Sequence, residues 1–139
     1  MADYFTRFSV ALRLKVTERD YALGLAAQAL RHRGEEAPVP ADYPPALVEV
    51  LEGWDFETDP DKDGIWLHSD SGGIDAVCVF IRHLLQKFNP KGSVTFEWSH
   101  DCTKPRLDAY GGGAAFITAH RIKTMSTSGW LQTVAAYAG

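Results

Sequence analysis

The polar residues that follow an alternating apolar segment near position 98 are the ones whose types could do chemistry. His100 and Cys102 are two residues apart, so on an extended strand their side chains point to the same side. A neighbouring histidine favours the thiolate, the reactive form in cysteine catalysis, and Lys104 would add positive potential. No third residue that would orient the histidine is recognisable, and Cys–His pairs usually come from distant segments. The pattern therefore predicts either a nucleophilic thiol or a polar loop after a strand.

Three consecutive glycines lie just beyond this cluster. Glycine runs occur where the backbone turns with positive φ or where another group approaches closely, and exposed amides in such a turn can hold an anion. Lys104 and Arg106 are near enough in the sequence to contact the same anion. The run lacks the spacing of a nucleotide-binding loop, and a bend at the start of a strand is the alternative. The candidate contact residues are His100, Cys102, Lys104, Arg106, Asp108, Tyr110, Gly111, Gly112 and Gly113.

A second candidate is the acidic segment from Asp59 to Asp70. Asp59, Asp61 and Asp63 stand at positions 1, 3 and 5 of a calcium-binding loop. Gly64 follows where the loop turns sharply, and Asp70 falls at position 12. A proline at the second position and strand-like residues after the loop depart from that motif, and a solvated hairpin turn is the alternative. Calcium is the one cofactor that the sequence suggests.

A zinc site would have to combine His100 and Cys102 with His68 or His120 from elsewhere in the chain. Zinc-binding motifs bring their ligands together in short spacings such as CxxC, HxxxH or HExxH. The sequence contains none of these spacings, so no zinc site is predicted.

Alternation and helical spacing locate the elements that must position these residues. Strands are predicted at 5–14, 53–58, 64–69, 94–99 and 114–122. One helix, capped by Thr17, is predicted to run to Arg33, and a short helix capped by Ser128 follows the last strand. The clearest helix is 74–88, because seven apolar residues recur there at i, i+3, i+4 spacing.

The two middle strands are predicted to form a hairpin, with the acidic segment as its turn. Ile65 and Leu67 alternate with Trp66 and His68. Alternate residues of a strand face opposite sides of a sheet. Trp66 and His68 are therefore expected on one face, away from the apolar pair.

The order of these elements, β-α-β-β-α-β-β-α, predicts an α+β fold. Its first six elements match the split βαβ arrangement of ferredoxin-like domains. A mostly antiparallel sheet with the two main helices on one face is the expected architecture. The length of 139 residues and the hydrophobic content of 45% are typical of one globular domain, spanning 1–139.

Charge and cysteine content limit the environment and the partners. The net charge of −4 disfavours a nucleic-acid-binding face, which needs clustered Lys and Arg. Two cysteines are too few for a disulfide framework. The sequence has neither a signal-peptide pattern nor an apolar run of about 18 residues that would span a membrane. A cytoplasmic protein without membrane contact is expected.

The second half of the chain resembles a group of small uncharacterised proteins of bacteria and their mobile elements. The resemblance rests on a Cys-x-x-Pro-Arg-Leu-Asp stretch, a triple glycine and a Ser-Gly-Trp-Leu segment. The matching positions are Cys102, Pro105, Arg106, Leu107, Asp108, Gly111 to Gly113, Ser128, Gly129, Trp130 and Leu131. The resemblance implies no activity, only that these residues form one local unit.

The leading functional prediction is a small non-catalytic binding or regulatory protein. Its segment 100–113 would contact a protein or a small anionic ligand, because polar and glycine residues are concentrated there without a complete catalytic set. One alternative is a small enzyme that uses Cys102 with His100, or Arg106 with Asp108. Another is a module stabilised by calcium in the segment 59–70. Homo-oligomerisation through an uncovered sheet edge stays open.

Overall fold

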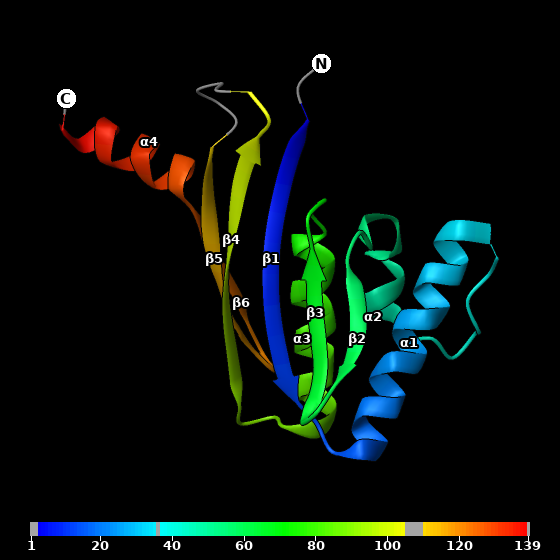
Figure 1. Cartoon of the computed structure of the whole chain (residues 1–139). Helices are drawn as coiled ribbons and strands as arrows, with labels where there is room; N and C mark the ends of the chain where they lie inside the picture. Colours follow the sequence, from blue (N-terminus) through cyan, green and yellow to red (C-terminus); the bar gives the residue numbers. More distant parts are fainter. Residues whose placement is uncertain (1–2, 36, 105–109, 139) are drawn as a thin grey trace.

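The fold is built on one sheet, with helices packed against one of its faces (Figure 1). The structure, a computed structural model, describes residues 3–35, 37–104 and 110–138. Six strands follow the order β2-β3-β1-β4-β5-β6, and every neighbouring pair is antiparallel. The strands are β1 (Tyr4–Arg13), β2 (Glu57–Asp61), β3 (Gly64–Ser69), β4 (Ser93–Cys102), β5 (Gly111–Thr118) and β6 (Ile122–Ser126). The helices are α1 (Val16–Glu35), α2 (Pro45–Val48), the 3₁₀ turn η1 (Leu51–Gly53), α3 (Ile74–Phe88) and α4 (Thr127–Ala138).

The predicted α+β class and the split βαβ arrangement are confirmed. β1 and β2 both pair antiparallel with β3, so they run parallel to each other with β3 between them. The crossover from β3 through α3 places β4 on the other side of β1. The last predicted strand, 114–122, is corrected: it is two strands, β5 and β6, joined by a short turn at His120. β5 and β6 extend the sheet beyond β4.

Strand β1 lies at the centre because its apolar residues alternate without interruption. Phe8, Val10 and Leu12 are buried, whereas Ser9 and Arg13 are exposed on the opposite face. Burying one side chain of this kind fully stabilises the folded state by roughly 1.5–3 kcal/mol relative to leaving it exposed. The alternation therefore fixes which face of β1 meets the helices, since a shift by one residue would exchange the faces.

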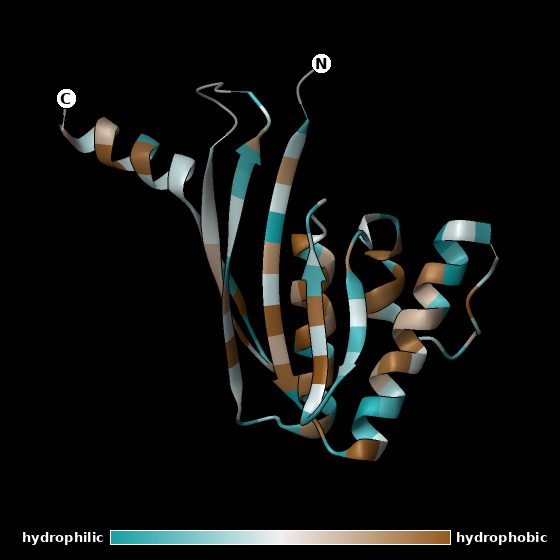
Figure 2. Cartoon of the chain, in the orientation of Figure 1, coloured by the Kyte–Doolittle hydropathy of each residue, from teal (hydrophilic) through white to brown (hydrophobic). Residues whose placement is uncertain are grey.

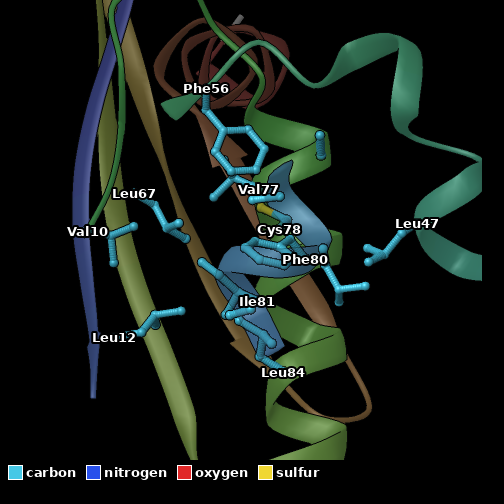
Figure 3. Packing of buried hydrophobic residues seen from close by; sticks show 14 of the residues in the cluster. Val10, Leu12, Leu47, Phe56, Leu67, Val77, Cys78, Phe80, Ile81 and Leu84 are labelled. Carbon is cyan, nitrogen blue, oxygen red and sulfur yellow. The ribbon is translucent and has the colours of Figure 1, made fainter. Parts of the chain in front are cut away.

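Helix α3 begins and ends at the residues that the apolar spacing predicted. Its buried side chains are Ala76, Val77, Cys78, Phe80, Ile81, Leu84 and Leu85. Figure 3 shows Val10, Leu12 and Leu67 on the sheet side of this helix, and Leu47 of α2 on the far side. α3 is therefore the central helix of the core, enclosed by the sheet and by α2.

Helix α1 packs on the sheet through small side chains. Ala22, Ala26 and Ala29 are buried along one stripe together with Leu25. Small residues let a helix approach its neighbours closely. The helix begins at Val16, which corrects the predicted Thr17 cap. Its first turn is instead closed by the Glu18 carboxylate, which accepts the amide of Lys15 at 2.9 Å.

Two further boundaries differ from the prediction. β2 begins at Glu57, four residues later than predicted, because Gly53 ends η1 and Trp54 is buried in the core. Trp54 stacks on Phe56 with ring centroids 4.7 Å apart. β4 continues to Cys102, past the predicted end at 99, because β1 pairs with it along this whole length. The polar residues that were read as a loop are thus partly strand.

The helix α4 differs from the others in having no buried residue. It projects from the end of β6, and Figure 2 shows hydrophobic segments along it that the sheet does not cover. In the part of the chain that the structure describes, no helix has the length and apolar character needed to cross a bilayer.

Candidate functional site

The end of β4 positions His100 and Cys102 on the same side of the strand. In the register with β1, His100 lies opposite Thr6 and Cys102 opposite Tyr4. The Nδ1 atom of His100 and the Oγ1 atom of Thr6 are 2.9 Å apart, so the imidazole is held by a hydroxyl group. Within the described residues, no hydrogen bond joins this histidine to Cys102. The geometry therefore gives His100 a structural partner and, among the described residues, gives Cys102 no hydrogen-bonded base.

A shallow hollow of about 300 Å³ opens beside His100. Its lining residues are Tyr4, Phe5, Thr6, His100, Asp101, Tyr110, Gly112, Thr127 and Ser128. The structure therefore brings His100, Tyr110 and Gly112, three of the predicted contact residues, to one place. It adds Thr127 and Ser128 of the first turn of α4; of these two, only Ser128 was associated with the glycines, through the resemblance. Lys104 is exposed just beyond β4, while Arg106 and Asp108 lie outside the described residues.

The triple glycine is part of β5, and each of its members meets a close neighbour. The backbone of Gly111 has φ +132°, in the region that favours glycine. The amide of Gly112 donates to Oγ1 of Thr127 at 3.0 Å. A β-carbon on Gly113 would come within 2.2 Å of the Trp98 indole. These contacts account for the glycines through packing, and the Gly112 amide is occupied by Thr127.

The start of α4 is fixed by Ser126. Its hydroxyl accepts the amide of Gly129 at 3.1 Å, which is the geometry of a helix N-cap. The predicted cap, Ser128, is instead inside the first turn. Thr127, at the first position of the helix, donates its hydroxyl to the carbonyl oxygen of Gly112 at 3.3 Å. α4 is therefore anchored to β5 at its first turn, while the rest of the helix extends away.

The two cysteines lie in different environments. Cys78 is buried in α3, and burial together with the nearby Asp75 carboxylate raises the pKa of its thiol to about 11. Cys102 is half-buried at the end of β4. A buried thiol with a raised pKa is inert, because the thiolate is the reactive form. Any thiol chemistry of the described chain therefore depends on Cys102.

The four aspartates of the predicted calcium loop do not converge. Asp59 and Asp61 lie on β2, and Asp63 is in the tight turn that joins β2 to β3. Asp70 follows β3, at the opposite end of the hairpin. Six residues of strand separate the two ends, which is a distance of roughly 20 Å. One ion cannot bind all four carboxylates in this arrangement.

Two features of the surface were missed by the sequence reasoning. The first is the exposed apolar face of α4. The second is a cluster in which Glu57 and Asp59 approach His68 across the β2–β3 hairpin. A signal for the second was present, because the hairpin and the common face of Trp66 and His68 were both predicted. The start of β2 at Glu57 was not predicted, so the Glu57 side chain was not associated with His68.

Comparison with protein-family models gives no match, and no curated protein or solved structure matches the chain significantly. The resemblance of the second half of the chain to small bacterial and mobile-element proteins therefore stays a prediction.

Proposed function

We propose that this protein is a non-catalytic binding module whose contact surface is α4 together with the exposed apolar side chains of β5 and β6. The partner supported best is a second copy of the same chain. The observation that carries this proposal is the composition and exposure of α4.

Helix α4 presents bulky apolar side chains to solvent. Trp130 is 57% exposed, Leu131 58%, Val134 42% and Tyr137 89%. Trp130, Val134 and Tyr137 are spaced four and three residues apart, so they form one stripe of the helix. The twelve residues of α4 include no charged side chain. An exposed apolar stripe of this kind marks an interaction surface.

The absence of charge in α4 favours an apolar partner surface, and the same chain offers one. Phe116 on β5 and Met125 on β6 are 45% and 46% exposed, on the sheet face opposite the helices. A symmetric dimer could place α4 of each copy against these side chains of the other. Met125 belongs to β6, the edge strand of the described sheet, and Phe116 belongs to the neighbouring strand β5.

The area available is of the size that a dimer needs. Aromatic side chains bury about 150–250 Å² each, and Trp130 and Tyr137 are only 57% and 89% exposed, so those of two copies would together remove on the order of 500 Å² from water. Leu131, Val134 and the sheet residues of both copies add to this. Specific interfaces bury about 1,200–2,000 Å² in total. A reciprocal contact through α4 can therefore reach the lower end of that range.

The three alternatives have less support. An anion between the glycines and Lys104 would need free backbone amides, but the Gly112 amide already donates a hydrogen bond to Oγ1 of Thr127. An enzyme using Cys102 would need an activating base, and the Nδ1 atom of His100 instead lies within hydrogen-bonding distance of Thr6. The calcium alternative would need carboxylates that converge, and the hairpin keeps Asp70 away from Asp61 and Asp63.

The test is the mass of the protein in solution, measured by light scattering and sedimentation over a range of micromolar concentrations. We expect a dimer for the wild-type chain. Val134→Asp should weaken it at least about tenfold, equivalent to 1.4 kcal/mol, because it places a charge on the apolar stripe. Val48→Asp is the matched control, since Val48 is also a helical valine and is 46% exposed, but on α2. It should leave the dimer unchanged.

A wild-type chain that stays monomeric at several hundred micromolar would exclude the second copy as partner. Equal effects of Val134→Asp and Val48→Asp would show that the dimer uses another surface. A rise in melting temperature with nucleotides or other anionic metabolites, lost on Lys104→Ala, would favour the anionic-ligand alternative instead.

A further inference from the structure

The hairpin of β2 and β3 brings one histidine and two carboxylates together at the edge of the sheet remote from α4. Glu57 lies directly opposite His68 in the strand register, and Asp59 is two residues further along on the same face. The Nε2 atom of His68 is 2.6 Å from Oδ2 of Asp59, and its Nδ1 atom is 3.6 Å from Oε2 of Glu57. One ligand atom from each residue lies within 4.8 Å of the other two. Three potential metal ligands therefore converge from two strands.

The imidazole at the centre of this cluster is held in place by its neighbours. The Trp66 indole stacks on the His68 ring, with centroids 3.7 Å apart and an interplanar angle of 23°. The indole is itself fixed, because its Nε1–H donates to Oγ of Ser9 at 2.8 Å. The His68 side chain is 19% exposed, whereas those of Glu57 and Asp59 are 75% and 53% exposed. A fixed imidazole with two exposed carboxylates beside it can close around an ion with little rearrangement.

This environment separates His68 from the other histidines. His100 contacts a hydroxyl group of Thr6, and His83 contacts that of Tyr21. Within the ranges that the structure describes, His68 is the one histidine with carboxylates within 4.0 Å, and it has two. The pairing is a property of the hairpin register, because a shift by one residue would turn Glu57 and Asp59 to the other face.

We propose that Glu57, Asp59 and His68 bind a divalent transition-metal ion, for which Zn²⁺ is the appropriate probe. Imidazole and carboxylate ligands suit zinc and its neighbours in the transition series, whereas calcium takes six to eight oxygen ligands. Two ligands of one tetrahedral zinc ion lie roughly 3.4 Å apart, given bonds of about 2.1 Å. The separation of His68 from Asp59 has to open by less than about 1 Å to admit the ion.

The ion would occupy one ring nitrogen and both carboxylates. On Nε2 it takes the place of the hydrogen bond between His68 and Asp59. Three protein ligands leave one position of a tetrahedral ion open to water. The site is independent of the proposed dimer contact, because it lies on β2 and β3 at the opposite edge of the sheet.

The experiment is a calorimetric titration of the whole protein with Zn²⁺ at neutral pH, after treatment with a chelator, with Ca²⁺ titrated in parallel. We expect one zinc ion per chain and much weaker binding of calcium. Loss of a partner that only orients a ligand costs roughly 10–100-fold in affinity, so His68→Gln and Asp59→Asn should each cost at least that. Two matched controls should bind zinc like the wild type. They are Asp61→Asn, on the same strand and face, and His120→Gln, in the turn before β6.

A second readout needs no variant. Side-chain nitrogen NMR of the wild-type protein should show the His68 ring signals shifting with one equivalent of zinc, while those of the other histidines stay in place. Absence of zinc binding at 1 mM would overturn the proposal, and so would binding that His68→Gln leaves intact. So would a titration in which the signals of several histidines shift together, since that indicates adventitious surface binding.

Discussion

Gly113 of β5 and Trp98 of β4 lie opposite each other, so close that a β-carbon on the glycine would stand 2.2 Å from Cζ2 of the indole. The same β-carbon would stand 2.4 Å from the carbonyl oxygen of Met125 on β6. The position is therefore closed from the side of both neighbouring strands. The indole packs over the backbone of β5, and this contact fixes the end of the sheet from which α4 departs.

This closeness predicts a large effect for a small substitution. Gly113→Ala should lower the free energy of unfolding by about 1–3 kcal/mol, the usual cost of overpacking, because the Met125 carbonyl is backbone and cannot move aside. Gly24→Ala is the contrasting substitution, since Gly24 is in α1 and has no atom within 4 Å of its would-be β-carbon. It should raise stability by roughly 0.5–1 kcal/mol. Urea unfolding of both variants checks the prediction, and equal changes would contradict it.

The pH dependence of stability should carry a contribution from His83. Burial, and then the positive charge of Lys87, lower the pKa of this histidine in the folded protein below its ordinary value of 6.5. Between those two values the unfolded chain binds a proton that the folded chain excludes. The stability that depends on His83 is therefore fully present above about pH 6.5, the pKa of histidine in the unfolded chain. It is lost as the pH falls through the lower pKa of His83 in the folded protein.

Thermal unfolding from pH 8 to pH 5 measures this effect. The wild type should lose stability below about pH 6.5, and His83→Gln should lose less over the same range. The difference between the two curves isolates His83 from the other histidines. Parallel curves for the two proteins would mean that His83 carries the same proton affinity in the folded and unfolded states.

Thiol labelling should distinguish the two cysteines. The pKa of the Cys78 thiol is raised to about 11, first by burial and then by Asp75, so this residue should react only after unfolding. At pH 8 we expect one label per folded chain, on Cys102, and two labels in denaturant. Mass spectrometry of Cys102→Ser, which should take up none while folded, is the control. Rapid labelling of Cys102 below pH 7 would revive the enzyme alternative, because an ordinary thiol is protonated there.

A hydroxyl group in the core gives a prediction for α1. Tyr43 is 4% exposed, and its hydroxyl donates to the carbonyl oxygen of Leu25 at 2.8 Å. Tyr43→Phe should cost about 1 kcal/mol, the net contribution of a typical hydrogen bond. Burial raises the pKa of this phenol to about 12, so the bond should persist through alkaline solution. Urea unfolding measures this loss of stability. Tyr4→Phe, at a residue that is 59% exposed, should leave the free energy of unfolding unchanged.

The parts of the fold that the sequence predicted are those whose signal is local. Helix α3 was located to the residue, because its apolar spacing is continuous and its contacts with the sheet need nothing else. β1 and β3 were located from their alternation. The start of β2 was misplaced because Trp54 and Phe56 are apolar and strand-like in isolation. They are buried as part of a connection, a fact that depends on α3 far along the chain.

The candidate sites depended on contacts that no local pattern reveals. The triple glycine was recognisable as unusual, but its causes are Trp98 and Thr127, each some fifteen residues away. The cap of α4 was assigned to Ser128 rather than Ser126 because either serine fits the pattern. The Glu57 and His68 pair required the register of a hairpin, which turn composition alone does not fix.

The central position of β1 has a consequence for synthesis of the protein. Its two neighbours, β3 and β4, end at Ser69 and Cys102, so β1 leaves the ribosome well before the residues that cover its two edges. At about 5–20 residues per second, some 90 further residues take roughly 5–20 s to appear. Throughout that time β1, which carries Phe8, Val10 and Leu12, has at least one edge without its partner strand. We expect ribosome-bound chains that stop before β4 to be substrates for chaperones, and chains that include it to escape them.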